Sequence, residues 1–335
     1  DRSSAASDVY KRQRHTQEPS TSGEGIDLSD ISLTGAQEQL IREVFAVGKP
    51  VVVILVAGKP FAIPWVKENI PAILAQWYAG EQEGNSIADI LFGNVNPSGK
   101  LTFSFPQSTG HLPVYYNYLP TDKGYYKEPG TYEKPGRDYV FSNSSPLWAF
   151  GYGLSYTQFE YLKAVTDKEL YQANDTVCVT VQLKNTGKRT GKEVIQVYMR
   201  DVVSSVMTPV KQLKGFRKVD LLPGQTRETT IMIPVHEFYL TDDLGNRYLE
   251  SGKFELQVGT SSDRIYFNLP VYIGSSGKGG QTVSGTSFKS RTDGKVIQVK
   301  GTVRDIQATP LARVKVQSEE SGLSLIHISE PTRLR

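Results

Sequence analysis

The sequence predicts an α/β layer followed by an all-β sandwich and a partial third β module. Two observations carry this prediction. A continuous apolar run at 51–57 stands between segments of helical periodicity, which is typical of a strand buried on both faces. Beyond Phe159, apolar residues recur at every second position, as in 177–183, which is typical of strands with one buried face.

The α/β elements follow one another in a regular order. Thr34 to Gln37 has the spacing of a capping box, so a helix is expected to begin there and to end at Gly48. Further helices are expected around 62–69 and 82–92, and strands at 51–57, 72–78 and 101–105. This order implies a parallel sheet between helices, an α/β/α sandwich. We expect the sheet to be truncated, with any strand before Gly23 missing.

A long segment at 107–143 is rich in Tyr, Pro and Gly and has no strand or helix pattern. Connections of this length inside a compact domain tend to be functional. The segment is therefore a candidate binding loop.

The all-β part is predicted from several short alternating runs. Strands are expected at 177–183, 194–199, 228–233, 253–258 and 265–273, separated by turns such as Pro223-Gly224. A Gly- and Ser-rich linker is expected at 275–295, and residues 296–322 have the pattern of a partial β-sandwich. We therefore place domain boundaries at 14–156 and 157–274.

The two ends of the chain, residues 1–13 and 323–335, resemble translations of sequencing-adaptor DNA rather than natural protein. The alternative is a pair of genuine flexible tails. Because matching scars at both ends are improbable by chance, we exclude both segments from the fold prediction. We therefore expect the remainder to be a fragment.

Composition excludes several classes of function. The chain has 335 residues with 38 basic and 35 acidic side chains, so 38 − 35 gives a net charge of +3, which argues against a protein that coats nucleic acid. The one cysteine, Cys178, excludes a disulfide framework, and four histidines leave little for a metal centre. The apolar run 51–57 is far shorter than the roughly 18 residues of a membrane span. No cofactor is expected, and residues 58–60 lack the Gly-rich loop of a flavodoxin-like nucleotide binder.

Several short motifs occur in a fixed order. They are Gly80-Glu-Gln-Glu-Gly84, Ala88-Asp-Ile-Leu-Phe-Gly93, Asn96-Pro-Ser-Gly-Lys-Leu101, Phe150-Gly-Tyr-Gly-Leu-Ser-Tyr-Thr-Gln-Phe159 and Lys211-Gln-Leu-Lys-Gly-Phe-Arg217. In this order they resemble family-three glycoside hydrolases of the β-glucosidase-like branch, over about 22–273. The resemblance implies a C-terminal α/β/α domain followed by a fibronectin type III-like, immunoglobulin-type β-sandwich. The segment from 296 faintly resembles carboxypeptidase-regulatory-like sandwiches.

The resemblance also implies a catalytic role for Glu24. Retaining glycosidases use two carboxyl groups roughly 5–5.5 Å apart, a nucleophile and an acid/base. In this family the nucleophile is an Asp on an N-terminal TIM barrel, and such a barrel needs roughly 250 residues, for which this chain has no room. The acid/base lies on a loop of the α/β/α domain, and Glu24, between Gly23 and Gly25, matches its position. The alternative is a solvated loop carboxylate.

Other carboxylates fit the role less well. Glu81 and Glu83 stand at the start of an expected helix, where the dipole favours the ionised form and disfavours a proton donor. Asp27 is expected to be a polar loop residue. The family commonly has Arg just after that Asp, but Leu28 stands here, so a salt bridge is not carried over.

Sugar-binding residues are expected in the long loop. We select Tyr115, Tyr116, Arg137 and Asp138, because aromatic rings stack on sugar C–H faces and polar groups bind hydroxyls. The loop has further tyrosines at 125, 126, 132 and 139. The alternative is that these rings pack the loop onto the protein. Trp77 ends an expected strand, where α/β sites open, but core packing is favoured for it, and Cys178 is expected to be an inert strand residue.

These expectations combine into one function. The chain is expected to be the C-terminal part of a retaining, exo-acting β-glycosidase that removes terminal β-linked glucosyl or xylosyl residues from an oligosaccharide or β-glucoside. Its partner would be the barrel of the same polypeptide, its location periplasmic or secreted, and the fragment alone inactive. The alternative is a non-catalytic carbohydrate-binding or adhesion module.

Overall fold

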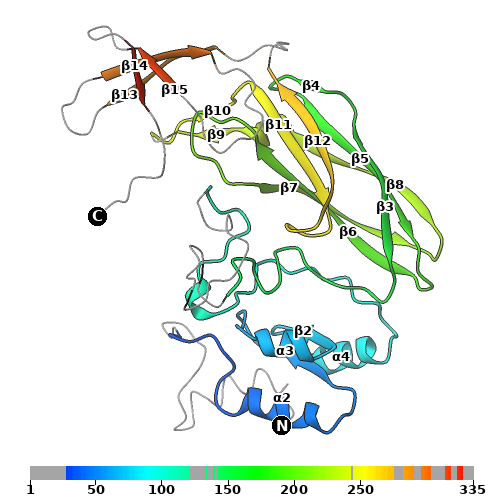
Figure 1. The fold of residues 1–335 in the computed structure, drawn as a ribbon. Coiled ribbons are helices and arrows are strands. Elements are labelled where there is room, and N and C mark those ends of the chain that lie inside the picture. Colours follow the sequence, from blue (N-terminus) through cyan, green and yellow to red (C-terminus); the bar gives the residue numbers. More distant parts are fainter. Residues whose placement is uncertain are drawn as a thin grey trace. The chain divides into compact units, whose positions relative to one another are not determined.

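The computed structural model describes residues 28–120, 133, 139, 142–242 and 244–274, together with the backbone of four short strands between 282 and 326 (Figure 1). The chain divides into two compact units, Asp1–Ile273 and Gly274–Arg335. The first unit contains the α/β layer and the β-sandwich. No described helix is long and apolar enough to cross a membrane.

The α/β layer is built on two parallel strands. Its elements are α2 (Gln37–Ala46), β1 (Val52–Leu55), α3 (Pro64–Asn69), β2 (Ala72–Ala75), α4 (Glu83–Leu91) and η1 (Thr109–His111). β1 pairs in parallel with β2, with Leu55 opposite Ala75. Pro64 starts α3, where its missing N–H costs nothing. The small core of the layer includes Val53, Leu55, Ile63 and Val66.

Two local predictions for this layer are wrong. Residues 101–105 form no strand; Phe105 makes only an isolated antiparallel bridge with Trp148. The backbone there is tied to 147–152 by single hydrogen bonds, including Leu101 N–H to the Tyr152 carbonyl. The Thr34 capping box also does not form, because α2 has Ala36 at its N-cap and no side chain caps it. The predicted helices and the other two strands are confirmed with shorter bounds.

The sandwich consists of two antiparallel sheets with one added parallel edge strand. Its strands are β3 (Phe159–Thr166), β4 (Leu170–Tyr171), β5 (Thr176–Asn185), β6 (Gly191–Asp201), β7 (Gln212–Leu221), β8 (Thr226–Pro234), β11 (Gly252–Gly259) and β12 (Ile265–Ile273). One sheet has the order β3-β5-β8 and the other β4-β12-β11-β6-β7. Along the chain, β8 and β11 are separated by η2 (Val235–Phe238) and by a two-stranded ribbon of β9 (Leu240–Thr241) and β10 (Arg247–Tyr248).

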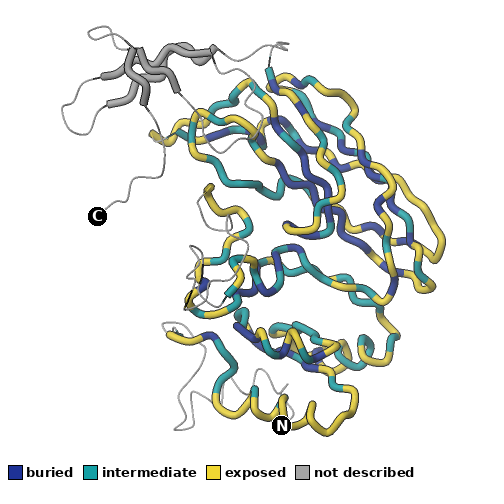
Figure 2. Tube along the Cα trace, viewed as in Figure 1, coloured by how far each residue is buried: buried dark blue, intermediate teal, exposed yellow. Residues whose placement is uncertain are grey.

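The core of the sandwich follows the alternation of its strands. Along β5 every second residue is buried, from Val177 to Leu183 at 0% exposure, whereas Cys178 lies on the other face. Leu256 on β11 and Phe238 on η2 are fully buried in the same cluster. Figure 2 shows dark buried stretches alternating with exposed ones along the strands of the sandwich, and α2 by contrast as mostly exposed.

The second unit is described only as backbone strands. β13 (Thr282–Lys289) pairs with β14 (Val296–Thr302), and β15 (Val314–Gln317) pairs with β16 (Leu323–Ile326), both antiparallel. β13 falls within the segment expected to be a linker, and β16 within the segment expected to be non-native.

Candidate functional site

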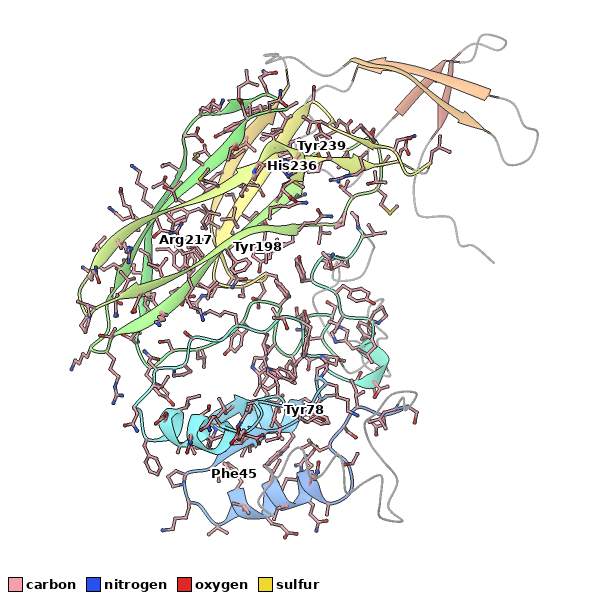
Figure 3. The ribbon with its side chains drawn as sticks, turned by 180° about the vertical axis from the view of Figure 1, so that it is seen from behind. Phe45, Tyr78, Tyr198, Arg217, His236 and Tyr239 are labelled. Atoms are coloured by element: carbon pink, nitrogen blue, oxygen red, sulfur yellow. The ribbon has the colours of Figure 1, made fainter. Side chains whose placement is uncertain are left out.

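The carboxyl ends of β1 and β2 meet at one edge of the α/β layer, because the strands are parallel. The chain leaves β1 through Gly58 and Lys59, and leaves β2 through Gln76, whose N–H donates to the Leu55 carbonyl at 3.0 Å. Tyr78, labelled in Figure 3, follows at the same edge, is half exposed, and lies against Gly58. This edge is the place where an α/β fold of this type presents its binding loops.

Trp77 lies at the end of β2 but is packed into the core. Its ring meets Phe103 at 5.0 Å and Phe105 at 6.1 Å between centroids. Its φ of 61° is in the left-handed region, which is rare for a bulky residue and concentrates at functional edges. The side chain of Trp77 therefore packs against the core, as the sequence analysis favours.

The segment that follows Glu24 is fixed to this edge. Ile31 is buried; its N–H donates to Thr109 Oγ1 at 3.2 Å and its carbonyl accepts the Ala62 N–H at 3.0 Å. The Asp30 carboxylate accepts from Ser32 N–H at 2.9 Å and from the Thr109 hydroxyl at 3.3 Å. The hydrogen bonds from Ser32 lower the pKa of Asp30. The segment is thus held between the loop after β1 and η1.

Glu24 and Asp27 lie outside the described residues. Glu24 precedes Asp30 by six residues, and an extended chain of that length spans at most about 20–22 Å. The role of Glu24 is therefore a proposal from the sequence and the family resemblance.

The rival carboxylates stand at the start of α4. Glu83 is buried at 5% exposure in the first turn, and Glu81 is exposed in the turn before it. Both positions agree with the predicted helix N-terminus. Among the described residues no three His, Cys, Asp or Glu side chains cluster as metal ligands.

His111 closes the base of the Tyr-rich loop. Its Nδ1 accepts the Gln107 N–H at 3.1 Å, and its Nε2 lies 3.0 Å from the Ser144 carbonyl. Because Nδ1 accepts, the ring carries its proton on Nε2 and donates to Ser144, which makes it the neutral tautomer. Its ring also contacts Tyr139 edge-on at 5.0 Å. A buried histidine thus joins the two ends of the loop.

Two of the selected loop residues are described, and they differ. Tyr115 is 67% exposed. Tyr116 stacks on Phe150 at 4.1 Å, and its hydroxyl accepts the Leu213 N–H of β7 at 3.1 Å. Tyr116 therefore attaches the loop to the sandwich, whereas Tyr115 stays accessible to a ligand. Arg137 and Asp138, like the tyrosines at 125, 126 and 132, lie outside the described residues.

Asn96 and Lys100 join the α/β layer to the sandwich. Asn96 Oδ1 accepts from the Ser155 hydroxyl at 3.0 Å and the Tyr156 N–H at 2.8 Å, and its Nδ2 donates to the Thr190 carbonyl at 2.9 Å. Lys100 Nζ lies 2.9 Å from Glu193 Oε1, and both side chains are largely buried. The Asn-Pro-Ser-Gly-Lys motif is thus a junction as well as a turn.

Sequence reasoning missed Lys59. It is half-buried at the carboxyl edge, its ammonium lies 6.0 Å from the Phe61 ring centroid, and burial lowers its pKa. The signal in the sequence is the Gly58-Lys-Pro60 turn shortly after β1, which the sequence analysis tests only as a phosphate loop.

Two family models match the chain. Residues 9–156 match the glycosyl hydrolase family 3 C-terminal domain, and residues 193–262 match a fibronectin type III-like domain. The chain therefore carries the C-terminal domain of glycosyl hydrolase family 3, followed by a fibronectin type III-like domain. The fold agrees with these matches, because a layer of parallel strands and helices precedes a β-sandwich. The first match includes residues 9–13, which the sequence analysis predicts to be non-native.

Several relatives of the chain are named as β-glycosidases. The chain is 40% identical over 246 residues to a beta-xylosidase of Formosa agariphila, covering 72% of this chain and 32% of that protein. It is 40% identical over 243 residues to a periplasmic beta-glucosidase of Salmonella typhimurium, covering 72% and 31%. A crystal structure of a beta-glucosidase from Listeria innocua with isofagomine superposes with a TM-score of 0.68 at 38% identity, covering 76% and 35%.

These matches cover only part of each relative. The chain spans about a third of the length of the relatives it matches. The family-3 domain that it carries is described as a C-terminal one.

Proposed function

We propose that this chain is the C-terminal part of a retaining, exo-acting β-glycosidase and that Glu24 is its general acid/base. The observation that carries the proposal is the identity of 40% with a β-xylosidase and with a β-glucosidase across both domains. The substrate would be a β-glucoside or an oligosaccharide with a terminal β-linked glucosyl or xylosyl residue.

The local geometry supports Glu24 in this role. Ile31, seven residues after Glu24, donates its N–H to Thr109 Oγ1, and Gly23 and Gly25 flank Glu24 in the sequence. A general acid first protonates the leaving oxygen and then, as a base, takes a proton from water. The nucleophilic carboxylate would come from the barrel, so the chain alone would be inactive.

The exposed apolar side chains of α2 support the proposal that this domain packs against another part of a larger polypeptide. Leu40, Val44 and Phe45 on α2 are 61%, 45% and 37% exposed, although helical periodicity places them on one face. A contiguous apolar face of this kind usually marks a contact surface. A periplasmic or secreted location is proposed from the periplasmic relative.

The test is a chimera. The part of the Salmonella relative that precedes the matched region would be joined to this chain from Arg14, and activity measured on aryl β-glucosides. Glu24→Gln is expected to reduce kcat by about 10²–10⁴-fold on a substrate with a poor leaving group. The loss should be smaller with a dinitrophenyl leaving group, which departs without protonation, and azide should restore turnover because it attacks without a base.

The matched control is Glu68→Gln, which changes an exposed glutamate on α3 and should leave kcat unchanged. Equal losses for both leaving groups in Glu24→Gln would contradict the acid/base assignment. Turnover by the unfused chain, abolished by Glu24→Gln, would contradict the requirement for a barrel. An intact chimera that binds sugars without turnover would favour the non-catalytic carbohydrate-binding or adhesion module.

A further inference from the structure

The β-sandwich contains a pocket of about 210 Å³ at the end where β6 finishes. Three segments surround it: the last residues of β6, the stretch 206–212 that leads into β7, and residues 239–241 after η2. Its lining is Met199, Asp201, Val206, Met207, Thr208, Pro209, Gln212, Tyr239, Leu240 and Thr241. Figure 3 shows Tyr239 beside His236 at this end of the sandwich.

Asp201 is the unusual member of the lining. Its Oδ2 is fully buried and has no hydrogen-bond partner among the described residues. Burial, and secondly the nearby Glu250 carboxylate, raise the pKa of Asp201 to about 7, although hydrogen bonds from Ser204 and the Val203 N–H oppose the shift. Because Asp201 also lines the pocket, its carboxyl is the acidic group that a ligand in the pocket would meet.

The rest of the lining indicates the chemistry of that ligand. Thr208, Gln212 and Thr241 supply hydroxyl and amide groups, and Tyr239 and the two methionines supply apolar surface. Arg247 lies 5.8 Å from the Tyr239 ring centroid, which helps to hold the ring. A hydroxyl group both donates and accepts, so it pairs with the Asp201 carboxyl in either protonation state. A ligand with several hydroxyls on an apolar ring matches this mixture.

A metal ion matches the pocket less well. The neighbouring Glu250 carboxylate already accepts from the Ser205 N–H at 3.0 Å and the Ser205 hydroxyl at 3.1 Å. Within the described residues no third acidic or imidazole ligand joins these two carboxylates. The volume is also below the roughly 300 Å³ at which drug-sized ligand pockets begin, which suits one small ring.

We propose that this pocket of the fibronectin type III-like domain binds a single sugar ring, with Asp201 as the hydrogen-bonding anchor and Tyr239 as the apolar wall. The sandwich then holds carbohydrate by itself and has a binding role of its own. The proposal does not depend on Glu24 or on turnover.

The test uses the whole chain, labelled with ¹⁵N and titrated with D-glucose and with D-xylose while amide resonances are followed. Saturable shifts are expected for residues 206–212 and 239–241. Asp201→Ala should weaken binding at least tenfold, whereas Asp220→Ala, which removes an exposed aspartate on β7, should leave it unchanged. Met207→Ala should weaken binding severalfold, and this variant is expected to fold normally because Met207 is 70% exposed.

Each contrary outcome overturns the proposal. The absence of shifts with both sugars rejects the pocket as a sugar site. Shifts elsewhere in the chain, or shifts that neither Asp201→Ala nor Met207→Ala weakens, reject the assigned residues. Shifts of the same amides with calcium chloride alone, and not with sugar, reject the ligand class. Because none of these measurements involves hydrolysis, their failure is distinguishable from the failure of the Glu24 chimera.

Discussion

The β-sandwich and the α/β layer bury their apolar residues to very different extents. In the sandwich, Val177, Leu183, Ile195 and Leu256 are all at 0% exposure, and both sheets contribute to one core. In the α/β layer, α2 has no buried residue, and its Leu40 is 61% exposed. The sandwich therefore buries its apolar residues in one large core, whereas the α/β layer has a smaller core to which α2 contributes no buried residue.

Breaking the Lys100–Glu193 ion pair between the α/β layer and the sandwich should have the largest effect on the free energy of unfolding. Lys100→Met leaves Glu193 buried without its cation, and removal of one partner of a buried pair costs about 3–5 kcal/mol in the free energy of unfolding. Urea denaturation measures this, with tryptophan fluorescence reporting the α/β layer, because Trp65, Trp77 and Trp148 all precede the sandwich. Circular dichroism in parallel reports the strands.

The double variant Lys100→Met with Glu193→Gln is the control for this prediction. It removes both charges and should recover most of the loss. If Lys100→Met changes the unfolding free energy no more than a surface substitution, the junction does not stabilise the layer.

A comparison of two leucines tests the difference in burial directly. Leu256→Ala opens a cavity in the sandwich core and should cost about 2–5 kcal/mol. Leu40→Ala on α2 removes an exposed side chain and should change stability by less than about 0.5 kcal/mol. Both are measured by urea denaturation. Equal losses would show that α2 is as well packed as the sandwich.

The pH dependence of the sandwich should carry the signature of Asp201. Its pKa is about 7 in the folded chain and near 3.8 when unfolded, so the folded state binds more protons between these values. The free energy of unfolding should therefore fall as pH rises from about 4 to 7, less than the full pKa shift implies, because solvent screens a side chain that is only partly buried. Asp201→Asn should remove this fall. The difference between the pH profiles of the original chain and the Asp201→Asn variant cancels the contributions of the other titrating groups. Parallel profiles for these two proteins would contradict the prediction.

Tyr116→Phe should change the free energy of unfolding less than Lys100→Met or Leu256→Ala. It removes the hydroxyl that accepts the Leu213 N–H and keeps the ring on Phe150, so the expected cost is about 0.5–1.5 kcal/mol. Faster hydrogen exchange of the Leu213 amide is the direct measurement. Tyr115→Phe is the control and should change neither quantity, because that ring is exposed.

The sequence predicted well those elements whose structure depends on neighbouring residues, and poorly those that depend on contacts between distant segments. The alternation at 177–183 is a property of neighbouring residues, and it predicted the buried face of β5 correctly. The strand expected at 101–105 is apolar enough, but within the described part of the chain its one bridge is that of Phe105 with Trp148. Pairing is a tertiary property, so local pattern did not reveal it.

In the candidate site, too, local motifs were predictable from the sequence and long-range contacts were not. Motif order led to the family and to Glu24, whose role stays a proposal. The contacts of Tyr116 with β7, and of Asn96 with Thr190, join residues about a hundred positions apart and carry no local signal. Asp201 was missed for a similar reason, since its buried oxygen depends on segments that meet only in the folded sandwich.

The three hydrogen bonds of the Asn96 side chain have a practical consequence for recombination. A crossover between homologues placed at residue 156, where the first family match ends, would separate Asn96 from Thr190 and Lys100 from Glu193. Hybrid enzymes should therefore inherit 96–193 from one parent. Shuffling libraries that respect this block are expected to yield more soluble progeny than those cut at the apparent domain boundary.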